Sequence, residues 1–558
     1  MAHVLTEHSS PNGRTDDVRS ATRHDVLVIG AGFSGLYLIH RLRDVLGLDV
    51  RAFERGPDVG GTWYWNRYPG ARCDVESTFY SYSFDPRLQQ DWVWNERYAA
   101  QPDILAYANH VADRFDLRRS IEFEAEVISA EFDDATTTWT ITTADGRRAS
   151  APFLVTGVGC LSVPLEPDFE GMADFAGDVL HTGHWPHDGF DFTGKRVAVI
   201  GTGSSGIQVI PKIAEQAAEL TVFQRTATYS APASNRPITE VERQRTKRNY
   251  REISAAARDS HLGFLDDPAI GPGMTTDPYA ARSELERRWW RNGLSIVRTF
   301  TDTLVSPETN ALVADFVRAK IRSTVTDPET AALLEPRDYP IGTKRIVIDT
   351  DYFETYNRPN VHLVSVRDEP IERFTEHGIV VGGTTHEFDA IVLATGFDAI
   401  TGALNRIRIV GREGATLREA WAEGPRTYLG IAVHGFPNLF TVTGPGSPSV
   451  LPNVLAAIEQ HVEWISDYLE HLRAAGISRT EAELEAQDEW VAHVNALAAP
   501  TLFPSAASWY MGANVPGKPR VFMPFLGGLG VYRRHCAEVA EDGYRGFRHE
   551  HGGTIAQE

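Results

Sequence analysis

The sequence predicts an α/β protein with two Rossmann-like dinucleotide-binding domains, one for FAD and one for NADPH, and a helical insertion. Two apolar strands carry this prediction, because one runs into Gly30-Ala-Gly32-Phe-Ser-Gly35 and the other into Gly201-Thr-Gly203-Ser-Ser-Gly206. In a strand-GxGxxG-helix unit the glycines allow a tight turn and let the backbone approach a pyrophosphate. One such motif is weak evidence, since a tight turn in an unrelated α/β protein explains it equally well. Its repetition favours two dinucleotide sites.

The residue that ends the second strand of each unit differs between the two copies. Twenty-four positions after the first glycine stand Glu54 in the first copy and Arg225 in the second. A carboxylate at this place accepts hydrogen bonds from a ribose diol, whereas a guanidinium pairs with a 2′-phosphate. We therefore assign FAD to the first site and NADPH to the second. The alternative, a surface charge at a strand end, is weaker for the matched pair than for either residue alone.

Composition narrows the class of protein. A chain of 558 residues is long enough for two or three domains, and its net charge of −21 makes a nucleic-acid-binding surface unexpected. No apolar run approaches the roughly 20 residues that span a bilayer, and no secretion leader is evident. We predict a cytoplasmic location. We predict no membrane segment and no metal site. Cys73, Cys160 and Cys536 are far apart in sequence, which argues against a disulfide reductase with two nucleotides.

The chain divides into seven predicted parts. These are a disordered lead-in (1–23), a first FAD-domain segment (24–160), a first NADPH-domain segment (161–232), the helical insertion (233–338), a second NADPH-domain segment (339–396), a second FAD-domain segment (397–548) and a disordered tail (549–558).

Periodicity predicts several elements within these parts. Apolar residues at helical spacing indicate helices after Gly35, over 101–117 and over 455–472, and alternation over 121–148 indicates a β-meander. Ser306-Pro and Asp327-Pro each have the pattern of an N-cap followed by proline at the first helical position.

Two charged positions stand out from their surroundings. Asp74 ends an aromatic loop that starts at Gly61, and an acid in such a loop is costly to desolvate without a cationic partner. The rest of that loop has a simpler interpretation as a cover for the flavin. Lys344 and Arg345 are adjacent cations at the start of an apolar strand, and a solvated strand end is the alternative for them.

Two motifs carry a resemblance to a known family. Phe175-x-Gly177-x3-His181-x3-Trp185-Pro186 lies between the two glycine turns, and Gly61-x-Trp63-x4-Tyr68-Pro69-Gly70-x3-Asp74 follows the first. The chain resembles the type I Baeyer-Villiger monooxygenases, in the phenylacetone and steroid monooxygenase branch, from about residue 24 to 548. From the residues alone, His181 and Trp185 are expected on a linker between domains in a structural role. The resemblance implies that they couple domain motion to the cofactor.

The resemblance also implies roles for single residues. Arg345 is expected at the reaction centre, Asp74 as the carboxylate that positions it, and Lys344 on the NADPH phosphate. Trp509 is expected against the nicotinamide nucleotide, and Ser449, Val450 and Leu451 along the substrate pocket. The predicted cofactor-binding residues are Gly30, Gly32, Phe33, Ser34, Gly35, Glu54, Gly61, Thr62, Trp63, Asp74, Tyr80, Gly201, Thr202, Gly203, Ser204, Ser205, Gly206, Arg225, Thr226, Lys344, Arg345 and Trp509.

The activity that the resemblance implies is insertion of one oxygen atom of O2 next to a ketone carbonyl, through a C4a-peroxyflavin, to give an ester or lactone. The expected partners are therefore a small ketone and O2, with the protein a monomer or weak homo-oligomer. Two alternatives stay open: a flavin-dependent N- or S-oxygenase, and a flavoprotein that binds its nucleotides without turnover.

Overall fold

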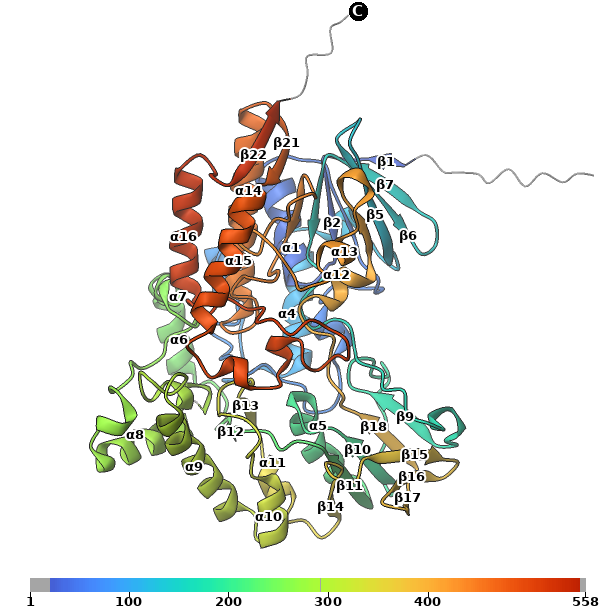
Figure 1. Ribbon diagram of the computed structural model, residues 1–558, viewed down its shortest axis with the longest axis vertical. Helices are drawn as coiled ribbons and strands as arrows, with labels where there is room; N and C mark the ends of the chain where they lie inside the picture. The colour runs from blue at the N-terminus through green and yellow to red at the C-terminus, as the bar shows by residue number, and fades with distance from the viewer. Residues whose placement is uncertain (1–20, 292, 552–558) are drawn as a thin grey trace, which may run out of the picture.

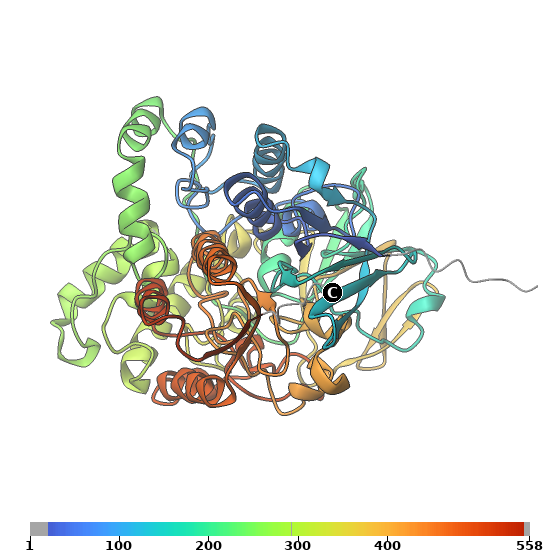
Figure 2. The ribbon, with the colours of Figure 1, turned by 90° about the horizontal axis from the view of Figure 1, so that it is seen from above.

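The computed structural model describes residues 21–291 and 293–551 (Figure 1). Two five-stranded sheets, both parallel throughout, form the centres of two halves of the molecule, one above the other in this view. This arrangement confirms the predicted fold class. Seen from above, the helical insertion and the sheet that contains residues 127–151 lie on opposite sides of the molecule (Figure 2).

The first sheet contains the first glycine motif at the end of its central strand. Its strands, in spatial order, are β20 (Leu439–Thr441), β8 (Phe153–Thr156), β2 (Val26–Ile29), β3 (Val50–Phe53) and β4 (Ile121–Glu122). Strands β2 and β8 are almost wholly buried, as expected for parallel strands covered on both faces.

The second sheet repeats this topology around the second glycine motif. Its strands, in spatial order, are β9 (Asp178–His181), β18 (Ala390–Leu393), β10 (Arg196–Ile200), β11 (Glu219–Gln224) and β14 (Val361–Ser365). In both sheets the strand before GxGxxG is central, the next strand in sequence lies on one side of it, and a strand from later in the chain lies on the other.

Smaller sheets complete the two halves. The predicted meander is present as β5 (Val127–Asp133), β6 (Thr138–Thr143) and β7 (Arg148–Ala151), flanked by β1 (Thr22–Arg23) and β19 (Arg408–Val410). The remaining strands are β12 (Ser230–Pro232) with β13 (Val347–Asp349); β15 (Ile371–Thr375), β16 (Gly378–Val381) and β17 (Thr384–Glu387); and β21 (Ile477–Ala482) with β22 (Phe547–His551).

Residues at the inner edge of both predicted disordered ends form strands instead. Thr22 and Arg23 form strand β1 against β7, and residues 549–551 belong to β22, which pairs with β21. The sequence did not predict these strands because their residues are polar. An edge strand forms backbone hydrogen bonds with its neighbour and needs no apolar pattern of its own. The rest of the two predictions, residues 1–20 and 552–558, lies outside the described residues.

The helices of the first half surround its sheet. They are α1 (Phe33–Ile39), which continues as a π-helical turn over His40–Val45, α2 (Thr62–Trp65), α3 (Pro86–Asp91), α4 (Gln101–Arg114), α12 (Gly402–Arg406), α13 (Leu417–Ala420), α14 (Val454–Ala474), α15 (Leu484–Ala498) and α16 (Leu529–Glu541). The apolar residues that predicted the helix over 455–472 are all buried in α14.

The second half and the insertion contain the other helices. They are α5 (Ser204–Ala214), α6 (Glu240–Arg248), α7 (Tyr250–Asp259), α8 (Pro278–Arg291), α9 (Pro307–Thr324), α10 (Pro328–Leu334) and α11 (Tyr352–Thr355). Ser306 and Asp327 cap α9 and α10 through their side chains, with proline at the first helical position, as predicted.

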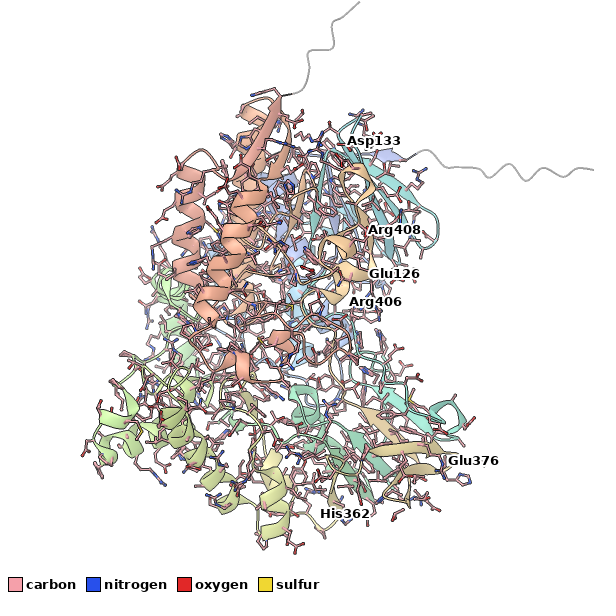
Figure 3. The ribbon with its side chains drawn as sticks, in the orientation of Figure 1. Glu126, Asp133, His362, Glu376, Arg406 and Arg408 are labelled. Atoms are coloured by element: carbon pink, nitrogen blue, oxygen red, sulfur yellow. The ribbon has the colours of Figure 1, made fainter. Side chains whose placement is uncertain are left out.

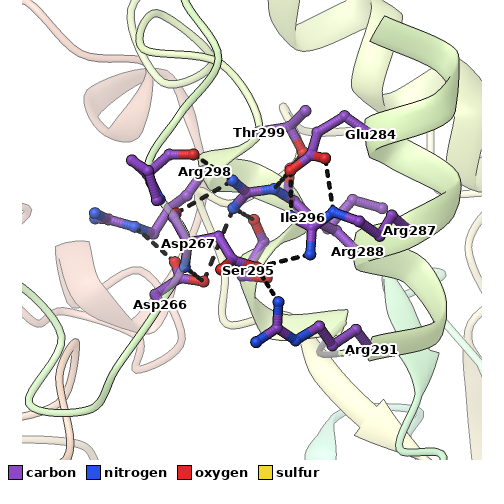
Figure 4. A network of polar contacts seen from close by, with 11 residues as sticks. Asp266, Asp267, Glu284, Arg287, Arg288, Arg291, Ser295, Ile296, Arg298 and Thr299 are labelled. Carbon is purple, nitrogen blue, oxygen red and sulfur yellow. Dashed lines mark hydrogen bonds and ion pairs between the residues drawn. The ribbon is translucent and has the colours of Figure 1, made fainter. Parts of the chain in front are cut away.

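A charged network fixes the middle of the insertion (Figure 4). Arg288 is fully buried, and its guanidinium donates to Glu284 Oε1 at 2.7 Å and to the carbonyl of Pro268 at 2.7 Å. Arg298 Nε donates to Asp266 Oδ2 at 3.0 Å, and Arg287 and Arg291 pair with Asp267. A buried guanidinium is tolerated only with such partners, so the network holds the 266–268 segment against α8.

The chain passes between the two halves along two segments that pair with each other. The first comprises residues 160–165 and the second residues 396–400; we call them the crossing segments. The amide of Leu165 donates to Gly396 O at 2.9 Å, that of Asp398 to Val163 O at 2.8 Å, and that of Ile400 to Cys160 O at 2.7 Å.

No helix in the two described ranges is both long and apolar enough to cross a membrane. The same ranges contain no cluster of three or more His, Cys, Asp or Glu side chains that could hold a metal ion.

Candidate active site

The first glycine turn connects β2 to α1 and leaves no room for larger residues. Gly30 has φ +102°, and a Cβ there would lie 2.6 Å from the carbonyl oxygen of Gly157. A Cβ at Gly35 would lie 1.9 Å from Gly30 O. Gly61, which starts the aromatic loop, would place a Cβ 2.9 Å from the Cα of Gly32. Gly30, Gly35 and Gly61 are therefore required by backbone packing. Of the other predicted residues of this turn, Gly32 is the N-cap of α1, and Phe33 and Ser34 begin the helix.

Glu54 lies directly after β3, as the sequence predicts, with its carboxylate beside the glycine turn. Its Oε2 accepts from the amide of Ala31 at 2.8 Å and its Oε1 from the amide of Gly56 at 2.8 Å. Burial raises the pKa of Glu54, and these two backbone donors oppose that shift. Each oxygen keeps a free lone pair, so the carboxylate fits a ribose diol placed in the turn.

Arg55 is a neighbour of this cradle that sequence reasoning missed. Its guanidinium lies 4.6 Å from the ring centroid of Trp65 and donates to the carbonyl of Ser162 at 3.1 Å. Burial lowers the pKa of Arg55. Of the two neighbours labelled in Figure 3, the charge of Glu126 raises this pKa and that of Arg406 lowers it. Arg55 thus joins β3 to α2 and to the first crossing segment.

The second glycine turn connects β10 to α5 in the same way. Gly201 has φ +108°, and a Cβ there would lie 2.5 Å from Ala394 O, while one at Gly206 would lie 2.2 Å from Gly201 O. At Gly203 an added Cβ would meet no atom within 4 Å, and this residue caps α5 without a side-chain hydrogen bond. Open space in front of uncapped helix amides fits a phosphate. Ser204 and Ser205 begin α5, and Thr202 Oγ1 donates to Thr226 O at 3.0 Å.

Two cations lie near this turn, and neither forms an ion pair within the described residues. Arg225 follows β11, is exposed, and makes no hydrogen bond or ion pair within the described residues. Lys344 has its Nζ 4.3 Å from the ring centroid of Tyr339 and likewise pairs with no acid in that part of the chain. Burial and then the charge of Arg225 lower the pKa of Lys344, so the two cations lie close together. Unpaired neighbouring cations suit an anion such as a 2′-phosphate.

Arg345 and Asp74 form an ion pair with two hydrogen bonds. Arg345 Nε donates to Asp74 Oδ2 at 2.8 Å and Nη2 donates to Oδ1 at 3.0 Å. Arg345 Nη1 donates to the carbonyls of Val450 and Leu451, both at 3.0 Å. Burial alone would lower the pKa of Arg345, but the charge of Asp74 raises it, so the group is a permanent cation. Four bonds use four of its five N–H groups, which leaves one on Nη2 for an anion.

Three segments meet at this pair. Arg345 precedes β13, Asp74 ends the loop that begins at Gly61, and Val450 lies before α14. Ser449 is fully buried, and its Oγ has no hydrogen-bond partner within the described residues. An orphaned hydroxyl beside Val450 indicates a group still to be bound there.

Residues 61–74, which we call the bridging loop, contact both glycine turns. At one end Trp63 Nε1 donates to Tyr80 OH at 3.0 Å, next to the first turn. In the middle, Tyr68 OH donates to Gln208 Oε1 at 2.8 Å, and Gln208 lies in α5. Asp74 ends the loop at Arg345. The sequence predicts an ordered loop here, and no sequence signal identifies Gln208.

The late aromatic loop also reaches the site. Trp509 is partly buried, and its ring lies 4.2 Å from that of Tyr510. Both pack in one apolar cluster with Val450 and Leu451. Tyr510 was not predicted: it is 1% exposed, burial raises its pKa to about 12, and the charges of Arg345 and Asp74 both act on it.

His181 and Trp185 were expected on a linker between domains, and the structure places both within the second half. His181 is the last residue of β9, the edge strand of the second sheet, and Trp185 is buried in the core of that half. His181 Nδ1 accepts from the amide of Gly183 at 2.9 Å, so Nε2 carries the proton that it shares with Leu165 O at 3.2 Å and Thr395 Oγ1 at 3.1 Å. Strand β9 escaped prediction because its first two residues are exposed.

Phe175 and Gly177 support the start of β9. A Cβ at Gly177 would lie 2.5 Å from Asp389 O and 2.7 Å from the Phe175 ring, which is buried. Glycine is therefore required for the ring to cover this end of the sheet.

One hollow of the described part lies away from this site. A cavity of about 160 Å³ is lined mainly by α15 and by residues 423–427 and 521–523. It touches neither Arg345 nor a glycine turn, so we do not assign the reaction to it.

Comparison with known proteins agrees with these features. Residues 23–234 match the family model "Flavin-binding monooxygenase-like". An acetone monooxygenase (methyl acetate-forming) of Gordonia sp. (strain TY-5) is 45% identical over 95% of this chain and 99% of its own. A phenazine N-monooxygenase of Lysobacter antibioticus is 42% identical over 94% of this chain and 96% of its own. An oxidised steroid monooxygenase bound to NADP has 52% identity and a TM-score of 0.92 over 95% of this chain and all of its own.

Proposed function

The chain belongs to the Baeyer-Villiger monooxygenases of the flavin-binding monooxygenase-like family, and from this premise we propose that it oxygenates ketones with FAD, NADPH and O2. The balanced reaction converts a ketone, O2, NADPH and a proton into an ester or lactone, NADP⁺ and water. The observation that carries the proposal is Arg345, a partly buried cation held by Asp74 with one N–H group left for an anion.

Two cofactor sites follow from the two turns. Gly30, Gly32, Gly35 and Glu54 would hold FAD, with the bridging loop beside it. Gly201, Gly203, Gly206, Arg225 and Lys344 would hold NADPH, the cations on its 2′-phosphate. Bound FAD, once reduced by NADPH, supplies the activation of O2 that side chains cannot perform.

The chain itself provides charge, orientation and exclusion of water. Arg345 would hold the oxyanion that forms on the substrate carbon when oxygen adds to the carbonyl. A fixed donor in such a place is worth about 3 kcal/mol. Asp74 and the carbonyls of Val450 and Leu451 fix the plane of the guanidinium, so it needs no rearrangement when charge develops. The apolar cluster around Val450, Tyr510 and Trp509 would keep water from the reacting atoms.

The predicted domain boundaries and the role of His181 and Trp185 in coupling domain motion to the cofactor belong to the same proposal. Contact of His181 with Leu165 in the first crossing segment and with Thr395, just before the second, supports a part in setting the angle between the halves. Three free cysteines support a reducing, cytoplasmic location. The proposal treats the protein as a monomer or weak homo-oligomer.

The test is a panel of aliphatic, aryl, cyclic and steroid ketones with NADPH and O2, with products identified by mass spectrometry. Formation of ester or lactone in proportion to NADPH consumed supports the proposal. The competing activity is oxygenation of nitrogen or sulfur, so aromatic amines, phenazines and sulfides complete the panel. Turnover confined to those heteroatom substrates would overturn the ketone assignment.

A further inference from the structure

The loop that carries Trp509 and Tyr510 is attached to the crossing segments by polar contacts. We call residues 506–523 the aromatic loop. At its end it bonds to the segment before Ser449, because Gly446 N donates to Met523 O at 2.7 Å; just after the loop, Phe525 N donates to Ser447 O at 2.9 Å. Its middle reaches away from the site: Asn514 Nδ2 donates to Phe397 O at 2.7 Å.

Lys518 makes the strongest of these contacts. Its Nζ donates to Asp398 Oδ1 at 2.6 Å and to the carbonyl of Ala399 at 2.7 Å. Only 10% of the Lys518 side chain and 25% of the Asp398 side chain are exposed. An ion pair so shielded from water is worth more than one on an open surface, and loss of one partner leaves a poorly solvated charge.

Apolar packing does not hold this part of the loop. Between Ala513 and Arg520 every residue is exposed or only partly buried. Residues 509–511, by contrast, pack in the cluster with Val450. The side chains of Lys518 and Asn514 therefore carry most of the attachment of residues 513–520.

The anchor of these contacts is the paired crossing. Asp398 donates its amide to Val163 in the first crossing segment while its carboxylate holds Lys518. His181 bonds to Leu165 and Thr395 at the same crossing. Any change in the angle between the halves that moves residues 396–400 must move the attachment of the aromatic loop as well.

We propose that Lys518 and Asp398 form a positioning pair that couples the crossing segments to the aromatic loop and keeps Trp509 and Tyr510 beside Arg345. The inference rests on the proposed function for its effect on turnover, but the attachment itself does not depend on it. Neither residue contacts the reacting groups, and both act through the loop.

The experiment compares Lys518→Met, Asp398→Asn and the double variant with wild type. Lys320→Met is the matched control, because Lys320 forms a partly buried ion pair with Glu286 at 2.6 Å within the insertion. Three quantities are measured: bound FAD, the ratio of ester to H2O2 formed per NADPH, and the rate of chymotrypsin cleavage after Trp509 or Tyr510. Lys518→Arg tests whether the charge restores the effect.

We expect unchanged FAD content, a fall of about tenfold in the ester to H2O2 ratio, and cleavage about tenfold faster in Lys518→Met. Asp398→Asn should change the ratio and the cleavage rate in the same way. The double variant should show no larger changes than Lys518→Met, and Lys518→Arg should recover most of the lost coupling. Lys320→Met should stay within twofold of wild type. Wild-type coupling and cleavage in Lys518→Met, or losses that multiply in the double variant, would overturn the proposal.

The two proposals fail in different ways. If wild type makes no ester from any ketone, the proposed function is wrong, yet the cleavage assay still tests the Lys518 attachment because it needs no turnover. If wild type makes ester and Lys518→Met is cleaved no faster, the positioning pair is wrong and the function stands.

Discussion

Arg345 and Asp74 face each other across two hydrogen bonds of 2.8 and 3.0 Å, although 271 positions separate them in the chain. Asp74 ends the bridging loop of the first half, and Arg345 precedes β13 after the insertion. The pair therefore exists only when both halves and the insertion have folded together. In the proposed reaction, Arg345 is the cation between the two cofactor sites, and its remaining N–H group is available to an anion.

Removing Asp74 should cost activity without loss of flavin. Asp74→Ala leaves a partly buried guanidinium without its carboxylate partner, held only through Nη1 by the carbonyls of Val450 and Leu451. We therefore expect ester formation to fall about 100-fold, in line with the loss of a preorganised charge. Asp74→Asn keeps the shape of the acceptor and should lose less. The measurements are the kcat for ester formation and the FAD to protein ratio. Asp259→Ala, at an exposed pair with Arg533, is the control. Equal activity in Asp74→Ala and wild type would refute the positioning role.

Arg225 and Lys344 should set the preference for NADPH over NADH. A charge-assisted hydrogen bond to phosphate contributes about 1.5–3 kcal/mol. We therefore expect Arg225→Ala and Lys344→Ala each to raise the KM for NADPH by roughly 10- to 100-fold while the KM for NADH changes little. Steady-state kinetics with both nucleotides measures this. A parallel rise for NADH would mean that the two cations do not read the 2′-phosphate.

The lowered pKa of Lys344 predicts a pH dependence of nucleotide binding. Burial and the charge of Arg225 favour the neutral amine, so the cation is lost at a lower pH than for an ordinary lysine. As pH rises through that lowered pKa, the Kd for NADP⁺ should increase while that for NAD⁺ stays flat. Calorimetric titration at several alkaline pH values gives both constants. Lys344→Arg stays charged and should remove the increase; its persistence in this variant would assign the effect to another group.

The cofactor chemistry was readable from the sequence because it depends on local patterns. The two GxGxxG turns, the contrast between Glu54 and Arg225, and α14 each follow from spacing within a few dozen residues. The pairing of Asp74 with Arg345 came from the family resemblance, and the structure confirms the contact. Strand β9 was missed because an exposed edge strand has no apolar pattern. The partners Tyr68 with Gln208, and Lys518 with Asp398, were missed because distant polar contacts leave no periodic signal.

The hydrogen bond between Tyr68 in the bridging loop and Gln208 in α5 should make a modest contribution to the rate of flavin reduction. Tyr68→Phe removes the hydroxyl that donates to Gln208 Oε1 and leaves the ring in place. A partly buried neutral hydrogen bond contributes about 1 kcal/mol, so we expect a drop of roughly fivefold in the rate of flavin reduction by NADPH. Gln208→Ala also removes the bond from Gln208 Nε2 to Arg72 O at 3.0 Å, so the double variant should lose no more than Gln208→Ala alone. Stopped-flow absorbance measures the rate, and independent losses in the double-mutant cycle would show that the two side chains do not act together.

The most direct measurement uses ¹⁸O2 with purified enzyme, NADPH and a ketone that the panel identifies as a substrate, comparing wild type with Arg345→Ala. Wild type should give ester with a single ¹⁸O atom, whereas Arg345→Ala should retain its FAD and give at least 100-fold less labelled ester, as expected for loss of a fixed donor to the oxyanion. Labelled ester formed by Arg345→Ala at the wild-type rate would contradict the role of Arg345, and product without ¹⁸O would contradict oxygen insertion from O2.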